Sequence, residues 1–248
     1  MLIVDSLVKS FGGLLAIDDL SLHIKKGVIH AVIGPNGAGK TTLISQLSGE
    51  IKPDSGTILF DGINISRMNV HLRSALGLAR SFQITNIFLD LTAQDNVSLA
   101  VQAHAGHSFK FWKNVSKDDE LRQPALEYLQ QVGLLERAEV VAGQLSHGEQ
   151  RQLEIAMALA TRPKLLLLDE PMAGMGPKES AAIVEILKEL KGELTLLLIE
   201  HDMDVVFSLA DYITVLVNGR DIATDSPEAI RKNAEVKAAY LGEEYTDA

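Results

Sequence analysis

The sequence has no cysteine, one tryptophan and aromatic residues at only 5% of its 248 positions. The absence of cysteine excludes a disulfide framework. Long apolar runs are also missing, because the best ones, 165–168 and 194–199, have the length of a strand. A membrane-spanning helix needs about 20 apolar residues, so we expect neither a membrane span nor a pore in this chain.

Basic residues are in the minority. The 23 Lys and Arg against 33 Asp and Glu give a formal charge of −10, with a pI near 5.2. A large contact with a nucleic-acid backbone depends on clustered basic residues, so we expect no nucleic-acid partner. The first five residues lack the basic region and apolar stretch of a signal peptide, and we therefore expect a cytoplasmic protein.

Apolar runs and turn residues predict an α/β fold in a single domain spanning residues 1–248. Strands cluster towards both ends of the chain, and the middle is mainly helical. The segment 104–117 holds the only tryptophan, Trp112, and is either a surface insertion folded back on the domain or a contact with a membrane partner. The expected strands are 20–24, 28–33, 57–60, 164–168, 194–199 and 213–217, and the expected helices are 94–102, 120–132, 148–160 and 177–190.

A glycine-rich segment follows the second expected strand and precedes a helix. It reads Gly-Pro-Asn-Gly-Ala-Gly-Lys-Thr and matches the phosphate-binding loop pattern in the context that this pattern requires. Glycines let backbone N–H groups converge on phosphate oxygens, Lys40 would reach the β- and γ-phosphates, and the Thr41 hydroxyl would ligate Mg²⁺. The expected nucleotide-binding residues are Gly34, Pro35, Asn36, Gly37, Ala38, Gly39, Lys40, Thr41 and Thr42.

Two acids follow a buried strand in Leu-Leu-Leu-Leu-Asp169-Glu170. Phosphoryl transfer needs a metal ligand and a base at such a place. Asp169 is expected to hold Mg²⁺, and Glu170 to polarise the attacking water as general base.

The segment Leu-Ser146-His147-Gly148-Glu149-Gln lies shortly before these acids and resembles the signature motif of ABC ATPases. The resemblance implies a phosphate-loop core with an antiparallel β subdomain and an inserted helical subdomain near residues 84–160. It also implies that Ser146, Gly148 and Glu149 close on the ATP held by a second subunit. His147 departs from the glycine that many members have.

Three further positions resemble residues of the same family. Gln83, in Ser-Phe-Gln, is similar to the glutamine that touches metal and attacking water, and His201 is similar to the switch histidine at the γ-phosphate. Phe11 resembles the aromatic residue on which adenine stacks, with a plain core position as its alternative. Gly176 departs from the Asp or Asn of most members.

Longer strings, among them Ala-Arg-Ser-Phe-Gln83 and Ile-Glu-His201-Asp-Met, resemble the ATPases of branched-chain amino acid importers. This implies ATP and Mg²⁺ as ligands, a second ATPase subunit of the same or a paralogous chain, transmembrane permease subunits and, indirectly, a solute-binding protein. The chain would lie on the inner face of the membrane. ATPases of urea or amide import and of lipopolysaccharide export are the alternatives within the family.

Two other classes fit less well. An ABC protein that acts on DNA or ribosomes would need a coiled-coil insertion or tandem ATPase domains and a basic surface. A kinase or small GTPase would share the phosphate loop but would lack the signature segment.

Overall fold

A computed structural model describes residues 1–81, 87–104 and 119–241. The chain divides into two compact units. The core unit comprises Met1–Leu76, Leu167–Glu170 and Leu190–Ala248, and the helical unit comprises Gly77–Leu166 and Pro171–Glu189. The chain therefore passes between the units at four places, one of which is the peptide bond from Glu170 to Pro171.

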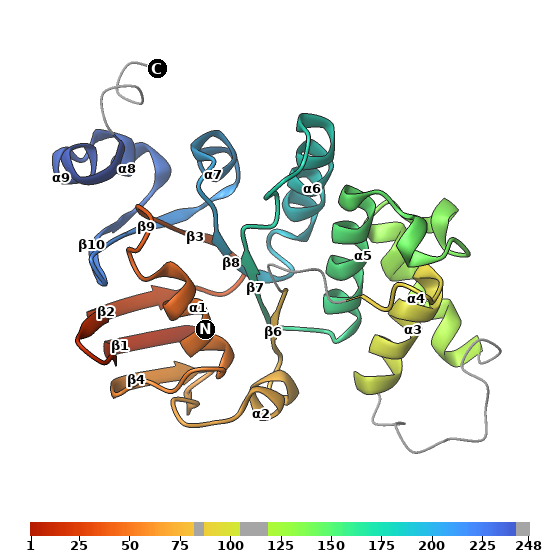
Figure 1. Cartoon of the computed structure of the whole chain (residues 1–248), viewed down its shortest axis with the longest axis horizontal. Coiled ribbons are helices and arrows are strands. Elements are labelled where there is room, and N and C mark those ends of the chain that lie inside the picture. The colour runs from red at the N-terminus through yellow and green to blue at the C-terminus, as the bar shows by residue number, and fades with distance from the viewer. Residues whose placement is uncertain (82–86, 105–118, 242–248) are drawn as a thin grey trace. The chain divides into compact units, whose positions relative to one another are not determined.

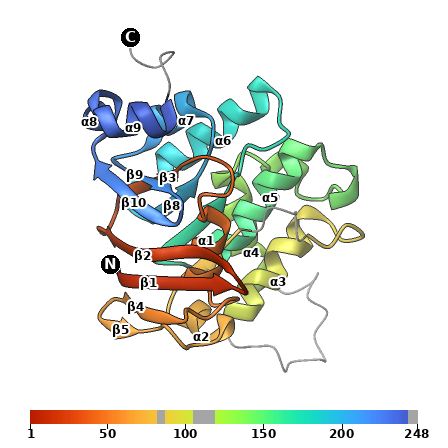
Figure 2. The ribbon, with the colours of Figure 1, turned by 60° about the vertical axis from the view of Figure 1, so that its left-hand side comes forward.

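The core unit contains an antiparallel sheet in the order β2-β1-β4-β5, which is clearest in Figure 2. Buried and exposed positions alternate along much of it, as expected for a sheet with one solvated face. The sequence predicted only the 20–24 and 57–60 parts of this sheet. Its strands are β1 (Leu2–Phe11), β2 (Leu14–Ile24), β4 (Ser55–Phe60) and β5 (Ile63–Asn64).

The second sheet of the core unit has the order β10-β9-β3-β8-β7, and β3 pairs in parallel with both β8 and β9. Every residue of β3, β7 and β8 is buried, which explains their unbroken apolar runs. The segments that follow parallel strands emerge at one edge of a sheet. The strands are β3 (Ile29–Ile33), β7 (Leu165–Asp169), β8 (Thr195–Ile199), β9 (Tyr212–Val217) and β10 (Arg220–Asp225).

Helices of the core unit pack on these strands. Val206, Ile230 and Val236 form a buried apolar cluster with residues of β3 and β9. The helices are α1 (Lys40–Ser48), α2 (Val70–Ala75), α7 (Met203–Leu209), α8 (Pro227–Lys232) and α9 (Ala234–Val236), followed by a π-helical turn at Lys237–Leu241. Among the described residues, no helix is long and apolar enough to cross a bilayer.

The helical unit is built on three mutually packed helices, α3 (Ala93–His104), α4 (Asp119–Gln131) and α5 (His147–Ala160), which Figure 1 shows gathered together. This unit also contains strand β6 (Leu78–Arg80) and α6 (Pro177–Leu190), and α6 begins and ends where the sequence predicted. Two 3₁₀ turns, Leu135–Arg137 and Ala142–Gln144, lead into α5. All four helices that the sequence predicted are present. Residues 105–117, with Trp112, lie outside the described residues.

Candidate nucleotide-binding and hydrolysis site

The phosphate loop connects β3 to α1, and its backbone excludes side chains at two glycines. At Gly34, φ is +152° and an added Cβ would lie 2.0 Å from the Leu216 carbonyl oxygen. At Gly39, φ is +105° and a Cβ would lie 2.5 Å from the Ala16 carbonyl oxygen. The loop therefore needs glycine at both positions for its shape.

Lys40, the first residue of α1, folds back over the loop. Its Nζ donates to the carbonyl oxygens of Gly34 and Pro35 at 2.6 and 3.0 Å. Burial lowers the pKa of the Lys40 amine, and the negative charges of Glu170 and Asp169 oppose this shift. The amine is thus held above the loop and within the field of both acids, where it can exchange carbonyls for phosphate oxygens.

The two acids lie at the end of β7. Asp169 is 3% exposed, whereas Glu170 is partly exposed and adopts a left-handed backbone conformation with φ of +46°. The Glu170 N–H donates to the Ile199 carbonyl of β8 at 2.9 Å. A left-handed conformation is unfavourable for a residue with a Cβ, and such strain tends to occur at functional sites.

His201 follows β8 and lies next to Glu170. Its Nδ1 is 3.8 Å from Glu170 Oε1 and 3.7 Å from Glu200 Oε2, and the side chain is 63% exposed. These separations are longer than hydrogen bonds, so the ring is close to the carboxylate without being fixed by it. The exposed ring remains accessible to a bound substrate.

A pocket of about 380 Å³ brings several predicted residues together. Phe11 is 46% exposed, so it is not a core residue, and the exposed Leu14 and Leu15 lie in the same wall. Motif reasoning missed both leucines and Asn218, which also lines the pocket. The full lining is Phe11, Leu14, Leu15, Ala16, Asn36, Gly37, Ala38, Gly39, Lys40, Thr41, Thr42, Glu170 and Asn218.

Asn218 and Gly219 form the turn between β9 and β10, with φ of +48° and +81°. Asn-Gly is the strongest short signal for a tight hairpin, and it could have been read from the sequence. The Gly219 N–H donates to the Ala38 carbonyl of the phosphate loop at 2.9 Å. The hairpin therefore supports the loop from the far end of the chain.

The acids and Thr41 suit one divalent cation bound together with phosphate oxygens. Among the described residues, no three His, Asp or Glu side chains form a group that could hold a metal ion. Mg²⁺ is usually bound by one or two carboxylates, water and substrate phosphates, so Asp169 and Thr41 are a fitting donor set. Gln83, the other predicted metal ligand, lies outside the described residues.

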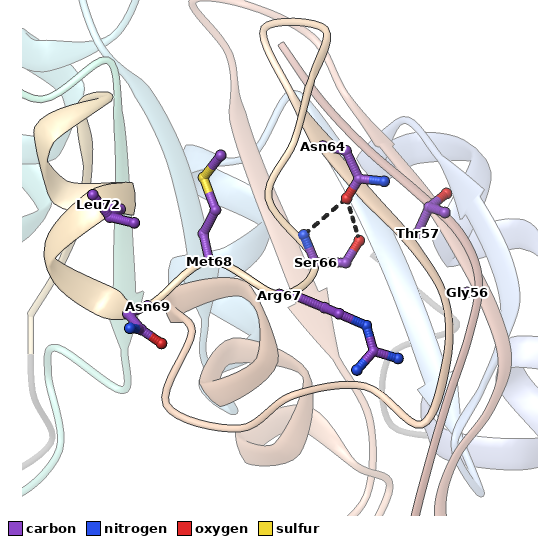
Figure 3. Close-up of a pocket in the computed structure, with 8 residues that line it drawn as sticks. All are labelled: Gly56, Thr57, Asn64, Ser66, Arg67, Met68, Asn69 and Leu72. Atoms are coloured by element: carbon purple, nitrogen blue, oxygen red, sulfur yellow. Dashed lines mark hydrogen bonds between the residues drawn. The ribbon is translucent and has the colours of Figure 1, made fainter.

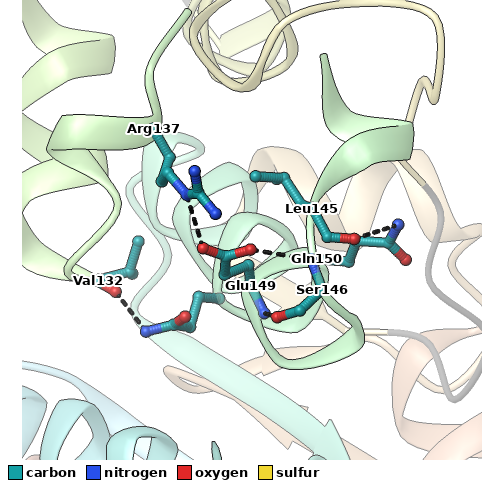
Figure 4. Close-up of polar contacts among 7 residues, drawn as sticks. Val132, Arg137, Leu145, Ser146, Glu149 and Gln150 are labelled. Carbon is teal, nitrogen blue, oxygen red and sulfur yellow. Dashed lines mark hydrogen bonds and ion pairs between the residues drawn. The ribbon is translucent and has the colours of Figure 1, made fainter. Parts of the chain in front are cut away.

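The signature segment starts α5 in the helical unit. Figure 4 shows the polar contacts of Ser146, Glu149 and Arg137 at this helix start. Ser146 is the N-cap: its Oγ accepts from the Glu149 N–H at 3.2 Å, and its own N–H donates to Glu149 Oε2 at 2.8 Å. Arg137 Nε donates to Glu149 Oε1 at 2.8 Å, and this bond is the main reason that the Glu149 pKa is lowered. The Glu149 side chain thus serves to build the helix start.

A Cβ added at Gly148 would lie 2.8 Å from Glu179 Cγ, so a side chain there would require the Glu179 side chain to shift. Glu179 Oε2 also accepts from the Gly176 N–H at 3.2 Å, at the start of α6. His147 is exposed. The segment therefore leaves the Ser146 hydroxyl at an exposed helix N-terminus.

A larger pocket, of about 630 Å³, lies elsewhere in the core unit (Figure 3). It is bordered by Gly56 and Thr57 of β4, by 64 and 66–69, and by Leu72 of α2. No predicted site residue lines it. Size alone would make this pocket the candidate nucleotide site. The phosphate loop and Glu170 line the smaller pocket, which is therefore the better candidate.

The chain matches the ABC transporter family over residues 17–173 and the branched-chain amino acid ATP-binding cassette transporter family over residues 222–246. It is 40% identical to the high-affinity branched-chain amino acid transport ATP-binding protein BraF of Pseudomonas aeruginosa, over 97% of each chain. It is 38% identical to LivG of Escherichia coli, which carries the same description, over 98% of each.

Solved structures agree with these relatives. The ADP conformation of MJ1267, an ATP-binding cassette of an ABC transporter, superimposes with a TM-score of 0.85 at 31% identity, covering 98% of this chain and 99% of that one. The dimeric structure of the bacterial ABC transporter cassette MJ0796 gives 0.77 at 27% identity, covering 92% and 99%. The predicted fold class is confirmed, and the chain belongs to the ATP-hydrolysing subunits of ABC transporters, in the branched-chain amino acid group.

Proposed function

We propose that this ATPase binds ATP with Mg²⁺ and uses its hydrolysis to drive the import of branched-chain amino acids through permease subunits. The observation that carries the proposal is the pocket in which the phosphate loop and Glu170 line the same space. A nucleotide phosphate chain and a general base are required there together.

Binding is assigned to the loop and the rim of the pocket. Backbone N–H groups of 36–42, which include the start of α1, receive the phosphates, and Lys40 supplies a cation to the β- and γ-phosphates. The exposed face of Phe11 offers a surface on which adenine can stack. Thr41, Asp169 and Gln83 would hold Mg²⁺, which neutralises charge on the phosphates when bound.

Hydrolysis uses Glu170, which follows β7, and His201, which lies after β8. Glu170 accepts a proton as a water oxygen forms a bond to the γ-phosphorus, and the bond from that phosphorus to the β–γ bridging oxygen breaks. The products are ADP and phosphate. His201, close to Glu170, orients the water and contacts the γ-phosphate.

A second ATPase subunit completes the site in this proposal. Ser146 and the Gly148 N–H lie at a helix N-terminus, which attracts anions and can close on the γ-phosphate held by the other chain. Glu149 contributes by fixing Ser146. The second chain is a copy of this one, with a paralogous subunit as the alternative in the cell.

The transported solute and the location are inferred from the relatives' descriptions. Both relatives are named for branched-chain amino acid transport. We infer a peripheral position on the cytoplasmic face of the membrane, bound to permease subunits that receive solute from a binding protein. Uptake of labelled leucine by cells with and without the gene tests the solute. Lost uptake of urea with intact leucine uptake would contradict it.

The site assignment is tested with Glu170→Gln and Lys40→Ala. In Glu170→Gln, the glutamine amide cannot accept the proton of the attacking water, so turnover should fall on the order of a hundredfold or more. ATP binding should stay normal, because the amide keeps the shape of the side chain. Lys40→Ala removes the cation aimed at the phosphates, so calorimetry should show weaker ATP binding. Near wild-type hydrolysis by Glu170→Gln would refute the general base.

A further inference from the structure

The turn that carries Glu170 is held on both sides. The Glu170 N–H donates to the Ile199 carbonyl in the core unit. One residue later, the Pro171 carbonyl accepts a hydrogen bond of 3.2 Å from Arg151 Nε of α5, inside the helical unit. The peptide bond between Glu170 and Pro171 is also a place where the chain passes from one unit to the other. The direction of the Glu170 side chain depends on the backbone on both sides of its Cα. A rotation of the Glu170–Pro171 peptide would change that direction.

Arg151 is a buried cation with a buried partner. It is 3% exposed, and its Nη1 pairs with a carboxylate oxygen of Glu154, which is 5% exposed and three residues further along α5. Burying two charges costs desolvation free energy, unless the charges pair with each other and their remaining polar atoms form hydrogen bonds. Glu154 holds one nitrogen of the planar guanidinium, and Nε is thereby directed at Pro171.

This arrangement explains how a left-handed glutamate is maintained. The conformation at Glu170, with φ of +46°, is disfavoured for a residue with a Cβ and persists only where its surroundings enforce it. The bond to Ile199 is made by the Glu170 N–H, and the bond from Arg151 reaches the carbonyl of the next residue, Pro171, whose ring fixes φ between the two peptides. If the second were lost, the Pro171 carbonyl could rotate and the carboxylate could leave the direction that the attacking water requires.

We propose that Arg151, oriented by Glu154, is a positioning residue that fixes the Pro171 carbonyl and thereby aims the Glu170 carboxylate. The proposal rests on the proposed function, in which Glu170 is the general base. Arg151 does not touch the reacting atoms, and its effect passes through the Glu170–Pro171 peptide.

The first experiment compares full-length wild-type protein with Arg151→Lys, which keeps the charge and loses the guanidinium fork. Misplacing a catalytic group by about 1 Å can lower the rate about a hundredfold, so we expect kcat to fall about 10- to 100-fold. The KM and the calorimetric Kd for ATP should stay within about twofold, because the phosphate loop is unaffected. An unchanged kcat, or a loss confined to KM, would overturn the proposal.

Arg122→Lys is the matched control. Arg122 is an arginine of α4 in the same unit that bonds Gln94 Oε1 and Glu139 Oε1 at 2.6 and 2.9 Å. Its exchange for lysine should leave kcat within about twofold of wild type. If Arg151→Lys does not fold, Glu154→Gln, which keeps the shape and removes the charge that orients Arg151, should give a kcat loss of the same kind. A wild-type kcat for a folded Glu154→Gln would then refute the role.

A double-mutant cycle separates positioning from a structural role. Residues that act as one unit are not additive, so Arg151→Lys should cause no further loss in single-turnover hydrolysis when Glu170→Gln is already present. Equal fractional losses in both backgrounds would show that Arg151 acts independently of Glu170. If Glu170→Gln alone hydrolyses normally, the proposed function fails. If Glu170→Gln is inactive and Arg151→Lys is normal, only the positioning role fails.

Discussion

At the scale of single residues, His30 shows how the strand before the phosphate loop responds to acid. The side chain is 1% exposed in β3, with Nε2 2.8 Å from Thr214 Oγ1 and the ring stacked on Tyr212 at 6.2 Å between centroids. Its Nδ1 has no hydrogen-bond partner within the described part of the chain. Burial, with a smaller effect from His23, lowers the pKa of His30 to about 4.

We predict that folding stability falls as the pH drops from neutral towards 4. The folded-state pKa is below the unfolded one, so the unfolded chain takes up a proton first and is stabilised by it. Between about pH 7 and pH 5 this one group should cost about 2 kcal/mol of unfolding free energy. Denaturant titrations of wild type and His30→Gln at pH 7 and pH 5 measure this loss of unfolding free energy. Equal losses of stability in both proteins would show that His30 is not responsible.

The site was readable from the sequence wherever neighbouring residues carry the chemistry. The phosphate loop and the pair Asp169 and Glu170 are contiguous motifs, and the structure gathers the loop and Glu170 at one pocket. Leu14 and Leu15 pair with Phe11 and Ser10 across a strand turn that the motifs do not include. The Asn218–Gly219 pair signals a hairpin, but nothing local shows that this hairpin lies at the pocket. The Pro171 carbonyl is anchored by Arg151, 20 residues away in the sequence, so no local pattern marked it either.

At the scale of elements, the far end of α1 is built around a buried arginine. Arg73 is fully buried and donates to the carbonyls of Gln46 and Leu47 at 2.6 and 2.7 Å, which are among the last of the helix. It also donates to the Ser66 and Met68 carbonyls. A cation at a helix C-terminus opposes the helix dipole favourably, so Arg73 stabilises the helix that begins with Lys40.

Gly49, which ends α1, makes room for this arginine. It has φ of +91°, and an added Cβ would lie 2.8 Å from Arg73 Nε. Gly49→Ala should therefore lower the unfolding free energy by about 2 to 4 kcal/mol, through a strained backbone and a displaced Arg73. Gly62→Ala is the control, because Gly62 has φ of +80° with no described atom within 4 Å of the added Cβ. It should cost only about 1 kcal/mol. Equal losses in chemical denaturation would contradict the role of Arg73.

Elements with a continuous apolar run or a clear apolar stripe were predicted, and elements without such a pattern were missed. The fully buried β3, β7 and β8 have continuous apolar runs, and α6 has a proline start and an apolar stripe. Strand β1 was missed because register shifts break its alternation, and Ser6 has φ of +48° within it. Strand β10 has no fully buried position, so its composition gives no signal.

At the scale of the whole molecule, each chain carries one phosphate loop and one signature segment. Under the proposed function, a triphosphate in the pocket would still present γ-phosphate oxygens that Lys40 and Mg²⁺ neutralise only in part. The exposed Ser146 helix start of a second chain can complete that shell, whereas ADP lacks the atoms to be gripped. The charge of −10 on each chain opposes association at long range, so moderate salt should assist it.

We predict that the nucleotide-free chain is mainly monomeric and that Glu170→Gln with ATP and Mg²⁺ forms a two-fold dimer. Sedimentation in ATP and in ADP measures this. Adding Ser146→Asp keeps a good N-cap but faces the phosphate with a like charge, so it should abolish the dimer without unfolding α5. A monomer in ATP at high micromolar protein, or an equally strong dimer in ADP, would rule out the closed pair.

The left-handed backbone of Glu170 also bears on how this gene evolves. Glycine would adopt that conformation without strain, and asparagine more easily than glutamate, so either would relieve the turn at the cost of the base. A copy released from the need to hydrolyse ATP would thus drift towards Gly or Asn at position 170 and gain stability as it did so. Under the proposed function, in which Glu170 is the general base, glutamate would be retained there only under selection for turnover, and the residue at position 170 would then separate hydrolysing copies from copies that only bind nucleotide.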